Sequence, residues 1–444
     1  MSNSTFCDAE PFWANACVGN NGNPTYVQYS KGYSQAANTL IDLVLSGRGI
    51  ELAVDDFIYP VCFNMRHSIE LRLKGAIEEL IKIAEIRGLS LDFNLSGSHD
   101  IGNIWFFFKR ESEELDSRYE EYNLLIDSTI RDVAEIDSTG QTFRYPVDVE
   151  SQKHLTEVAT INFLVLKVKF NHLEENLDKL HYLNTYLLEE YKLMTFTKKM
   201  SRLQLFHLAK DLPSRDKWKA DNFNQTKIDL RDKYGLSSND LTKAINLILS
   251  NYEMAPMIGG LIDLQGIGYE DLYMLLDEWV AINPEVSNRS LGTLGFEVVS
   301  TSDTDSMVKA FQKSQESRAA RNVVWEKLKD VITPEKLAGI KALFYFAREL
   351  KFCEYYLITY EYELKEASSY HKSNDKEFKN SFMHLFSKSN FVENIIESLY
   401  FLKHTELADQ IISRYELSES FSWIEGAKSR DKFKLPDICG YNKI

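Results

Sequence analysis

The sequence predicts an all-α protein with two helical lobes, and three observations support that prediction. The 444 residues include only 20 glycines and 9 prolines, both below their usual shares of about 7% and 5%, and these residues break helices. Apolar residues recur at intervals of three and four over long stretches, as on one face of a helix. Hydrophobic residues make up 44% of the chain, which is enough for large cores.

The N-terminal part predicts an irregular arm followed by a helical lobe. Residues 1–30 are rich in Asn, Ser and Gly and predict the arm, and residues 31–210 predict the lobe. Pro60 and Gly88 are the expected start and stop signals of its strongest helix. Asp100 is expected to cap the helix that contains Trp105. The expected helices of this lobe cover residues 33–46, 60–87, 98–126 and 152–196.

The C-terminal part predicts a polar connector and a second helical lobe. Residues 211–237 form the connector, and Ser237 and Asp240 form a capping box at the start of the next helix. The second lobe spans residues 238–444 and includes a small irregular or β insertion at 253–306. The best strand candidate in that insertion is FEVVS at 296–300. Long helices are expected over residues 333–368 and 390–416.

The charge and the cysteines limit the classes of function. The chain has 51 basic and 66 acidic residues and a formal charge of −15, so a nucleic acid could bind only at a local basic patch. Five scattered cysteines without a CxxC spacing favour a reducing compartment and argue against zinc. The sequence shows no signal peptide and no apolar run of about 20 residues. We therefore expect a cytoplasmic protein that needs neither a membrane nor a metal or cofactor.

The segment RHSIELRLK carries the most informative group of polar residues. Arg66, Glu70 and Lys74 recur every fourth residue and form one row on a helix, with His67 beside Lys74. The row borders the apolar stripe of that helix, where charged side chains are partly desolvated. Two interpretations remain open: a cluster that holds phosphate, and ordinary ion pairing along a helix, worth about 0.2–0.5 kcal/mol per pair.

Three motifs in this order resemble the HEPN superfamily of small helical domains. They are RHSIELRLK at 66–74, GSHDIGNIW at 97–105 and FRYPVD at 143–148, and the resemblance covers residues 55–195. It implies an up-and-down helical bundle, frequent dimerisation, and a place in bacterial toxin–antitoxin or anti-phage defence systems. Catalytic members are metal-independent ribonucleases, whereas others are inactive or are partners of nucleotidyltransferases.

The resemblance also implies a catalytic pair, an Arg followed four to six residues later by a His. Arg202 and His207 match that spacing, although Leu203 stands where the family usually has a polar residue. The His would act as acid or base on a ribose 2′-hydroxyl, and the Arg would neutralise phosphate. With 17 arginines and 9 histidines in the chain, about one such spacing is expected by chance.

A local basic patch surrounds this pair. Residues 195–219 contain seven Lys or Arg, among them Lys198 and Lys199, against two Asp, and Phe196, Phe206 and Trp218 lie among them. Cations with interleaved aromatic rings suit single-stranded RNA. The alternative is a basic helix end that pairs with acidic neighbours.

Arg144 in the FRYPVD motif also has two interpretations. It either pairs with Asp148 to fix a turn or joins Arg66 and His67 in holding phosphate. Taken together, the sequence predicts a defence protein that acts on or binds RNA or nucleotides, as an oligomer or with a protein partner. The alternatives are a non-catalytic helical scaffold subunit and a partner of a nucleotidyltransferase.

Overall fold

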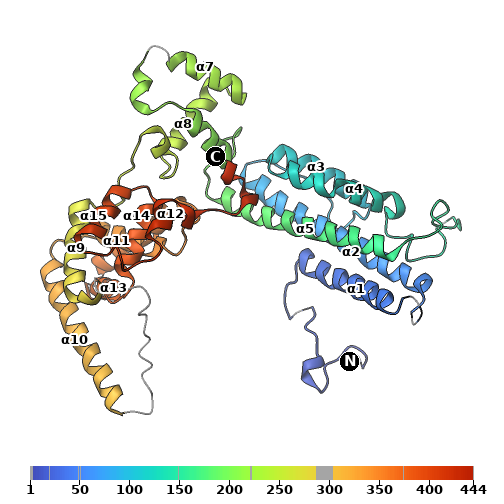
Figure 1. Ribbon diagram of the computed structural model, residues 1–444, viewed down its shortest axis with the longest axis horizontal. Coiled ribbons are helices and arrows are strands. Elements are labelled where there is room, and N and C mark those ends of the chain that lie inside the picture. Colours follow the sequence, from blue (N-terminus) through green and yellow to red (C-terminus); the bar gives the residue numbers. More distant parts are fainter. Residues whose placement is uncertain are drawn as a thin grey trace. The chain divides into compact units, whose positions relative to one another are not determined.

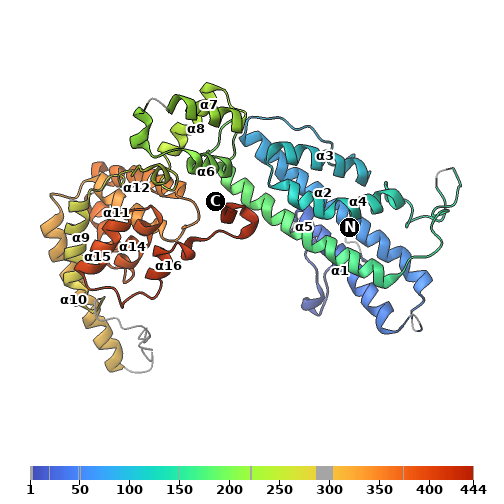
Figure 2. The same cartoon turned by 45° about the horizontal axis from the view of Figure 1, so that its top comes forward.

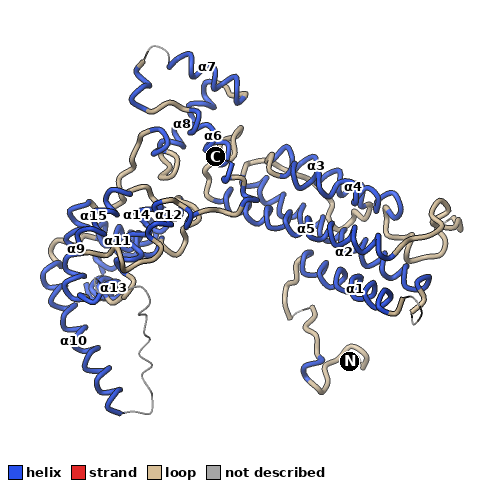
Figure 3. Tube along the Cα trace, in the orientation of Figure 1, coloured by secondary structure: helices blue, strands red, loops and turns tan. Residues whose placement is uncertain are grey.

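The computed structural model describes residues 4–19, 21–48, 50, 52–148, 150–220, 223–286, 304–373 and 375–443. Their regular structure is helical, and the one extended pairing among them is an isolated antiparallel bridge between Val147 and Lys153. The predicted all-α class is therefore confirmed (Figure 3). The chain divides into two compact units, residues 1–192 and 193–444. No helix in the described ranges is long and apolar enough to cross a membrane.

The first unit is a bundle of five helices with α2 at its centre (Figure 1). α2 contacts α1, α3 and α5, and α4 packs against α3 and α5. Fully buried side chains such as Leu73, Leu80 and Phe108 fill the space between them. The helices are α1 (Tyr26–Ser46), α2 (Val54–Ile86), α3 (Ile101–Leu115), α4 (Tyr119–Asp137) and α5 (Phe163–Lys192).

The predicted start of α2 at Pro60 is wrong, because the helix already begins at Val54. Pro60 lies inside the helix, where it cannot donate a hydrogen bond to the carbonyl four residues before it. The buried side chains that follow, including Val61 and Met65, supply the packing that keeps this part of α2 helical.

The predicted helix 98–126 is in fact two helices, and a buried ion-pair cluster explains the break. Arg118 donates hydrogen bonds to Asp116 (2.8 Å) and Glu190 (2.6 Å), and the Tyr191 hydroxyl donates to Asp116 (2.9 Å). Burial alone would raise the pKa of Asp116, but Arg118 lowers it below the ordinary value. Glu190 and Tyr191 belong to α5, so the sequence around residue 116 could not reveal the break. The predicted Asp100 cap is confirmed, since its carboxylate accepts from the Asn103 N–H at 2.9 Å.

The predicted helix 152–196 begins later than expected, at Phe163. The Asn162 side chain caps its first turn by accepting from the backbone N–H groups of Leu164 (2.9 Å) and Val165 (3.1 Å). The residues before Asn162 form an irregular segment that lies against the bundle, and this segment lines two pockets described below.

The second unit contains eleven described helices, which pack around two hydrophobic clusters. Figure 2 shows α9, α11, α12, α14, α15 and α16 gathered in one group of helices. The smaller cluster joins α6 and α8 and includes Leu205 and Leu241, and the larger one surrounds α11 and includes Trp279 and Phe344. The helices are α6 (Arg202–Asp211), α7 (Phe223–Tyr234), α8 (Ser238–Leu249), α9 (Tyr269–Ile282), α10 (Thr304–Leu328), α11 (Pro334–Phe346), α12 (Glu354–Ser373), α13 (Asp375–Phe386), α14 (Phe391–Phe401), α15 (Thr405–Arg414) and α16 (Ile424–Lys428).

Both long helices predicted in the second lobe, over residues 333–368 and 390–416, are interrupted. Residues 347–353 separate α11 from α12, and residues 402–404 separate α14 from α15. At the second break, the buried His404 donates from Nε2 to the Ile262 carbonyl (3.0 Å) and accepts at Nδ1 from the Tyr269 hydroxyl (2.9 Å). The predicted capping box of Ser237 and Asp240 is confirmed. The strand expected at 296–300 lies outside the described residues.

Candidate functional site

The Arg66–Glu70–Lys74 row is buried in the first unit, where each side chain is at most 4% exposed. Glu70 accepts from Arg66 and, at 2.8 Å, from Lys74. Arg66 also donates to the backbone carbonyls of Asp137 (3.2 Å) and Ser138 (2.7 Å) at the end of α4. The row thus connects two helices through charge-assisted hydrogen bonds.

The RHSIELRLK and GSHDIGNIW motifs meet at this row, and the turn before FRYPVD approaches it. Arg66 donates to the His99 carbonyl, and His99 Nδ1 lies 3.0 Å from Glu70 Oε1. Gly140, just before the FRYPVD motif, has φ +78°, and a Cβ there would lie 3.2 Å from the Arg66 guanidinium. Glycine is required at this position both for its left-handed backbone and for the close approach of Arg66.

The electrostatics of the row favour a structural role over phosphate binding. Burial alone would raise the pKa of Glu70, but its bonds to Lys74 and Arg66 lower it, so the carboxylate is charged at neutral pH. The acceptors already bound to Arg66 use its Nε and both terminal nitrogens. These four acceptors use four of the five N–H donors of the guanidinium, so a phosphate that bound Arg66 through two N–H groups would have to displace at least one of them.

His67 and Arg144 lie outside this buried row. The His67 ring packs edge-on against Tyr33 (4.4 Å between ring centroids) and stacks on Phe63 (5.8 Å). Burial lowers the pKa of His67, and among the charges around it Glu70 raises that pKa while Arg66, Lys74 and Arg144 lower it. Arg144 is exposed, with its guanidinium over the rings of Phe63 (5.8 Å) and Tyr145 (5.2 Å). Of the two interpretations of Arg144, the pairing with Asp148 does not occur among the ion pairs of the described residues.

A pocket of about 960 Å³ lies between the start of α2 and the segment 142–163, and we call it the Arg144 pocket. Arg144, Lys153 and His154 line it, and among the described lining residues Asp55 is the one acid. The His154 Nε2 atom is buried and has no hydrogen-bond partner among the described residues. Arg144 and Lys153 therefore give the pocket positive charge, and the His154 side chain adds to its lining.

Lys153 and His154 were missed as site residues because the sequence predicted a helix over 152–196. The backbone there is irregular, and the bridge between Val147 and Lys153 brings the two ends of a turn together. The only local sign of a site was that Lys153 and His154 are adjacent in the sequence, and this sign points to a binding site only once the fold brings Arg144 beside them.

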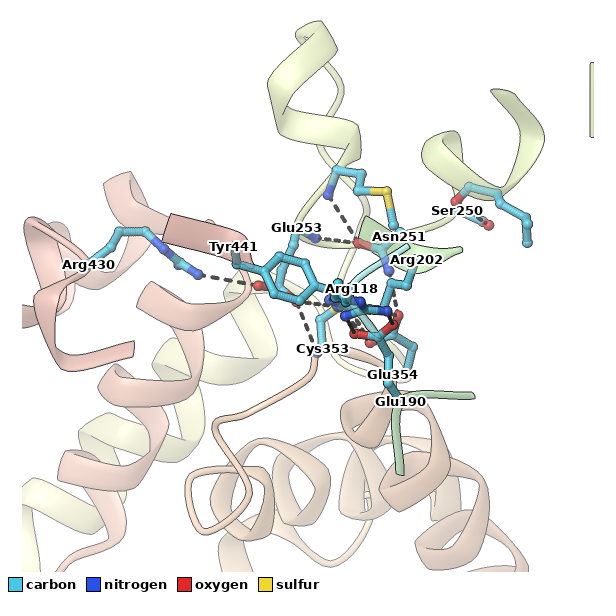
Figure 4. Close-up of polar contacts among 12 residues, drawn as sticks. Arg118, Glu190, Arg202, Ser250, Asn251, Glu253, Cys353, Glu354, Arg430 and Tyr441 are labelled. Carbon is cyan, nitrogen blue, oxygen red and sulfur yellow. Dashed lines mark hydrogen bonds and ion pairs between the residues drawn. The ribbon is translucent and has the colours of Figure 1, made fainter. Parts of the chain in front are cut away.

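Arg202 is buried in the second unit and fully engaged there (Figure 4). It binds Glu354 through two nitrogens (2.9 and 3.0 Å) and Glu253 through one (2.7 Å), and it donates to the Tyr441 hydroxyl (3.1 Å). Its guanidinium also lies over the ring of Phe206 at 4.9 Å. Burial alone would lower the pKa of Arg202, but Glu354 and the other partners raise it well above the ordinary value.

This network also contains a group that resembles a metal site. One ligand atom each from Glu253, Cys353 and Glu354 lie within 4.8 Å of one another. Both carboxylates are bound to Arg202, however, and burial raises the pKa of the Cys353 thiol well above its ordinary value. A buried guanidinium between two carboxylates and a neutral thiol serves the packing of the unit, and we assign no metal here.

His207 does not face Arg202. The two residues are five positions apart in α6, which places their side chains about 140° apart around the helix. His207 is half-buried. The spacing that matches the family motif therefore does not produce an Arg–His pair on one face of the helix.

Lys198 and Lys199 are exposed at the start of the basic patch. The aromatic rings expected to interleave with the cations are engaged within the unit. Phe206 is 8% exposed, and Trp218 stacks on Phe223 (5.1 Å between centroids) and donates to the Pro213 carbonyl (2.9 Å). The patch thus offers positive charge, but Phe206 is buried and one face of the Trp218 ring is already covered by Phe223.

The candidate residues belong to different units. Arg66, His67, Glu70, Lys74 and Arg144 lie in the first, whereas Lys198, Lys199, Arg202 and His207 lie in the second. Comparisons with protein-family models, curated proteins and solved structures find no match to this chain. The function therefore has to be argued from the geometry of the residues.

Proposed function

We propose that this chain is a HEPN-like helical protein that binds RNA or a nucleotide through its first unit, with the phosphate in the Arg144 pocket. The observation that carries the proposal is the gathering of Arg144, Lys153 and His154 around one pocket of an otherwise acidic chain. Phosphate oxygens suit such a site, because Arg and Lys supply charge-assisted hydrogen bonds. A cytoplasmic location, expected from the cysteines and the apolar pattern, and a role in bacterial anti-phage defence, implied by the resemblance, belong to the proposal.

The arrangement of the three motifs supports the resemblance. Arg66 donates to the His99 carbonyl, the His99 side chain lies 3.0 Å from Glu70, and Gly140, three residues before the FRYPVD motif, lies against the Arg66 guanidinium. In this arrangement the buried row fixes the base of the FRYPVD segment, and Arg144 in that segment remains exposed. The row thus positions the binding residue and does not itself bind the ligand.

Binding fits the geometry better than cleavage by Arg202 and His207. Arg202 has two carboxylate partners, and His207 points to a different side of α6. A nuclease would need the Arg accessible to a phosphate and the His within hydrogen-bond reach of the ribose.

The first test measures binding of a 5′-phosphorylated single-stranded RNA oligonucleotide and of the same oligonucleotide without the phosphate. We expect Arg144→Ala/Lys153→Ala to weaken binding at least tenfold. The plot of log binding constant against log salt concentration should also become less steep, because each neutralised phosphate of a single strand contributes about 0.7 to its slope. Arg131→Ala is the matched control, because Arg131 is an exposed arginine of the same unit that pairs with Asp127 at 3.0 Å. Equal affinities for wild type and the double variant would contradict the proposal.

The second test asks whether the protein cuts RNA at all. Total cellular RNA is incubated with the protein in EDTA, beside Arg202→Ala/His207→Ala and Arg66→Ala/His67→Ala. On the binding proposal, wild type leaves the RNA intact. Metal-independent cutting that the first double variant abolishes would instead establish a ribonuclease at Arg202 and His207.

A second candidate is a non-catalytic interaction subunit of a larger defence complex, or a partner of a nucleotidyltransferase. One observation favours it: two of the three arginines that the sequence predicted to contact phosphate, Arg66 and Arg202, are buried in ion-pair networks. Purification from the native cell distinguishes this candidate, because stoichiometric co-purified subunits without RNA support it. A single species that carries RNA favours the binding proposal.

A further inference from the structure

A second pocket of the first unit, of about 370 Å³, opens between α2, α4 and α5, and we call it the apolar pocket. Met65 and Ile69 line it from α2, Val133 and Ile136 from α4, and Leu173 from α5. Because three packed helices carry these side chains, the cavity is a feature of the bundle itself. Pockets that hold small molecules typically measure about 300–1,000 Å³.

The polar groups around the apolar pocket show which ligands do not suit it. Asp132 and Lys169 are both exposed, so their opposite charges favour neither an anion nor a cation. The Asn162 side-chain oxygen already caps α5, and Arg66 is bound to Glu70 and three carbonyls. The other uncharged polar side chains of the lining are Thr129 and Thr160, so a nucleobase or sugar would leave most of its polar edges without partners and would bind with a desolvation cost.

The volume indicates the size of a ligand that would fill the pocket. A water molecule has a share of about 30 Å³ in the liquid, and a methylene group is of similar size. The pocket therefore holds an aliphatic chain of about ten carbons. An engineered apolar cavity of about 150 Å³ already binds benzene, so this larger one has room for such a chain.

The apolar pocket and the Arg144 pocket share a wall. Phe143, Val158, Thr160 and Ile161 line both of them. Phe143 directly precedes Arg144 in the sequence. A molecule that fills the apolar pocket therefore contacts the same residues that position the phosphate-binding side chain.

We propose that the apolar pocket binds one uncharged aliphatic molecule and that its occupancy changes the affinity of the Arg144 pocket for its ligand. The second half of this inference rests on the proposed function, whereas the first half does not. Because the coupling is a free energy between two sites, the ligand of the Arg144 pocket must change the affinity for the aliphatic molecule by the same factor.

The test uses 1-decanol as the probe and isothermal titration calorimetry as the readout, with decanoate and decylamine as charged analogues of the same length. Val165→Trp places a large ring at the pocket, which Val165 lines from α5. Val168→Trp is the matched control, because Val168 lies one turn further on α5, is 69% exposed and does not line the pocket. Val133→Phe fills the pocket from α4, and circular dichroism shows whether each variant is folded.

We expect saturable binding of one decanol per chain, a loss of at least tenfold in affinity in folded Val165→Trp or Val133→Phe, and no change in Val168→Trp. Absence of saturable binding, equal affinity in the filled variants, or tighter binding of either charged analogue would overturn the aliphatic site.

The coupling is tested by repeating the titration of the 5′-phosphorylated RNA with the pocket saturated by decanol. We expect the RNA affinity to change at least threefold in wild type and not in Val165→Trp. An unchanged RNA affinity would overturn the coupling. If the RNA does not bind even without decanol, the proposed function fails, while the decanol titration still decides the aliphatic site.

Discussion

Replacing Glu70 by Gln is the most direct test of whether the buried row is structural. The Glu70 carboxylate contacts Arg66, Lys74 at 2.8 Å and His99 at 3.0 Å, and its side chain is 4% exposed. The substitution keeps the volume but leaves two buried cations without their carboxylate. Removal of one partner from a buried ion pair costs about 3–5 kcal/mol, so we expect the first unit to lose about that much stability.

The assay is urea unfolding followed by circular dichroism, with the transitions of the two units fitted separately because two-state behaviour is not expected of a two-unit chain. Glu78→Gln is the control on the same helix, because Glu78 is 44% exposed and its contact with Lys82 is long, at 3.5 Å. Exposed pairs of this kind contribute about 0.3–0.5 kcal/mol.

The result that would refute this reasoning is a loss in Glu70→Gln as small as that in Glu78→Gln. A gain in phosphate affinity in Glu70→Gln would also contradict it. Such a gain would mean that the carboxylate competes with a ligand for Arg66 and Lys74.

Four further outcomes are expected. The fold lowers the pKa of Glu70 below its ordinary value of 4.5. The charged carboxylate therefore stabilises the first unit above pH 4.5, and this stabilisation is lost as the pH falls through the lowered pKa. Unfolding of wild type and Glu70→Gln at a series of acidic pH values measures the loss. Arg202→Met leaves two buried carboxylates without a cation, so the second unit should lose about 3–5 kcal/mol in urea unfolding while RNA binding by the first unit persists. Burial lowers the pKa of His404 below 6.5. Neutral His404 therefore contributes to the stability of the second unit above pH 6.5, and this contribution is lost as the pH falls below that value. In His404→Gln the midpoint of thermal unfolding should no longer fall with pH in this range for that reason. Gly140→Ala should destabilise the first unit by about 1–2 kcal/mol for its left-handed backbone, with a further cost from the contact with Arg66, whereas Gly88→Ala, where φ is +71° and nothing lies within 4 Å, should show the backbone cost alone.

The sequence predicts helical content well because helical periodicity and capping are local properties. Asp100 and Ser237 illustrate this, since each cap forms with a residue three positions later. The interruptions could not be predicted, because neither Gly nor Pro marks them. The break near Asp116 depends on Glu190, and the break before Glu354 depends on Arg202, so both require contacts between distant parts of the chain.

The candidate site shows the same division between local and distant information. The sequence places Arg66, Glu70 and Lys74 in one row, and helical geometry is enough for that. Whether the row binds a ligand or other parts of the protein depends on contacts with two other segments. These are the carbonyls of His99 and Ser138, which accept hydrogen bonds from Arg66. These contacts decide the role of the row, and no local pattern encodes them.

The Arg202 network has a consequence for the kinetics of folding. Its partners lie 51, 152 and 239 residues further along the chain, and native contacts of such long separation form slowly because loop closure must come first. Until Glu253 and Glu354 contact Arg202, a collapsed intermediate has to keep this guanidinium hydrated. The surface around α6 therefore stays solvated and incompletely packed. The second unit should therefore fold through a populated intermediate, and the rate at which that intermediate disappears should report the closure of these loops.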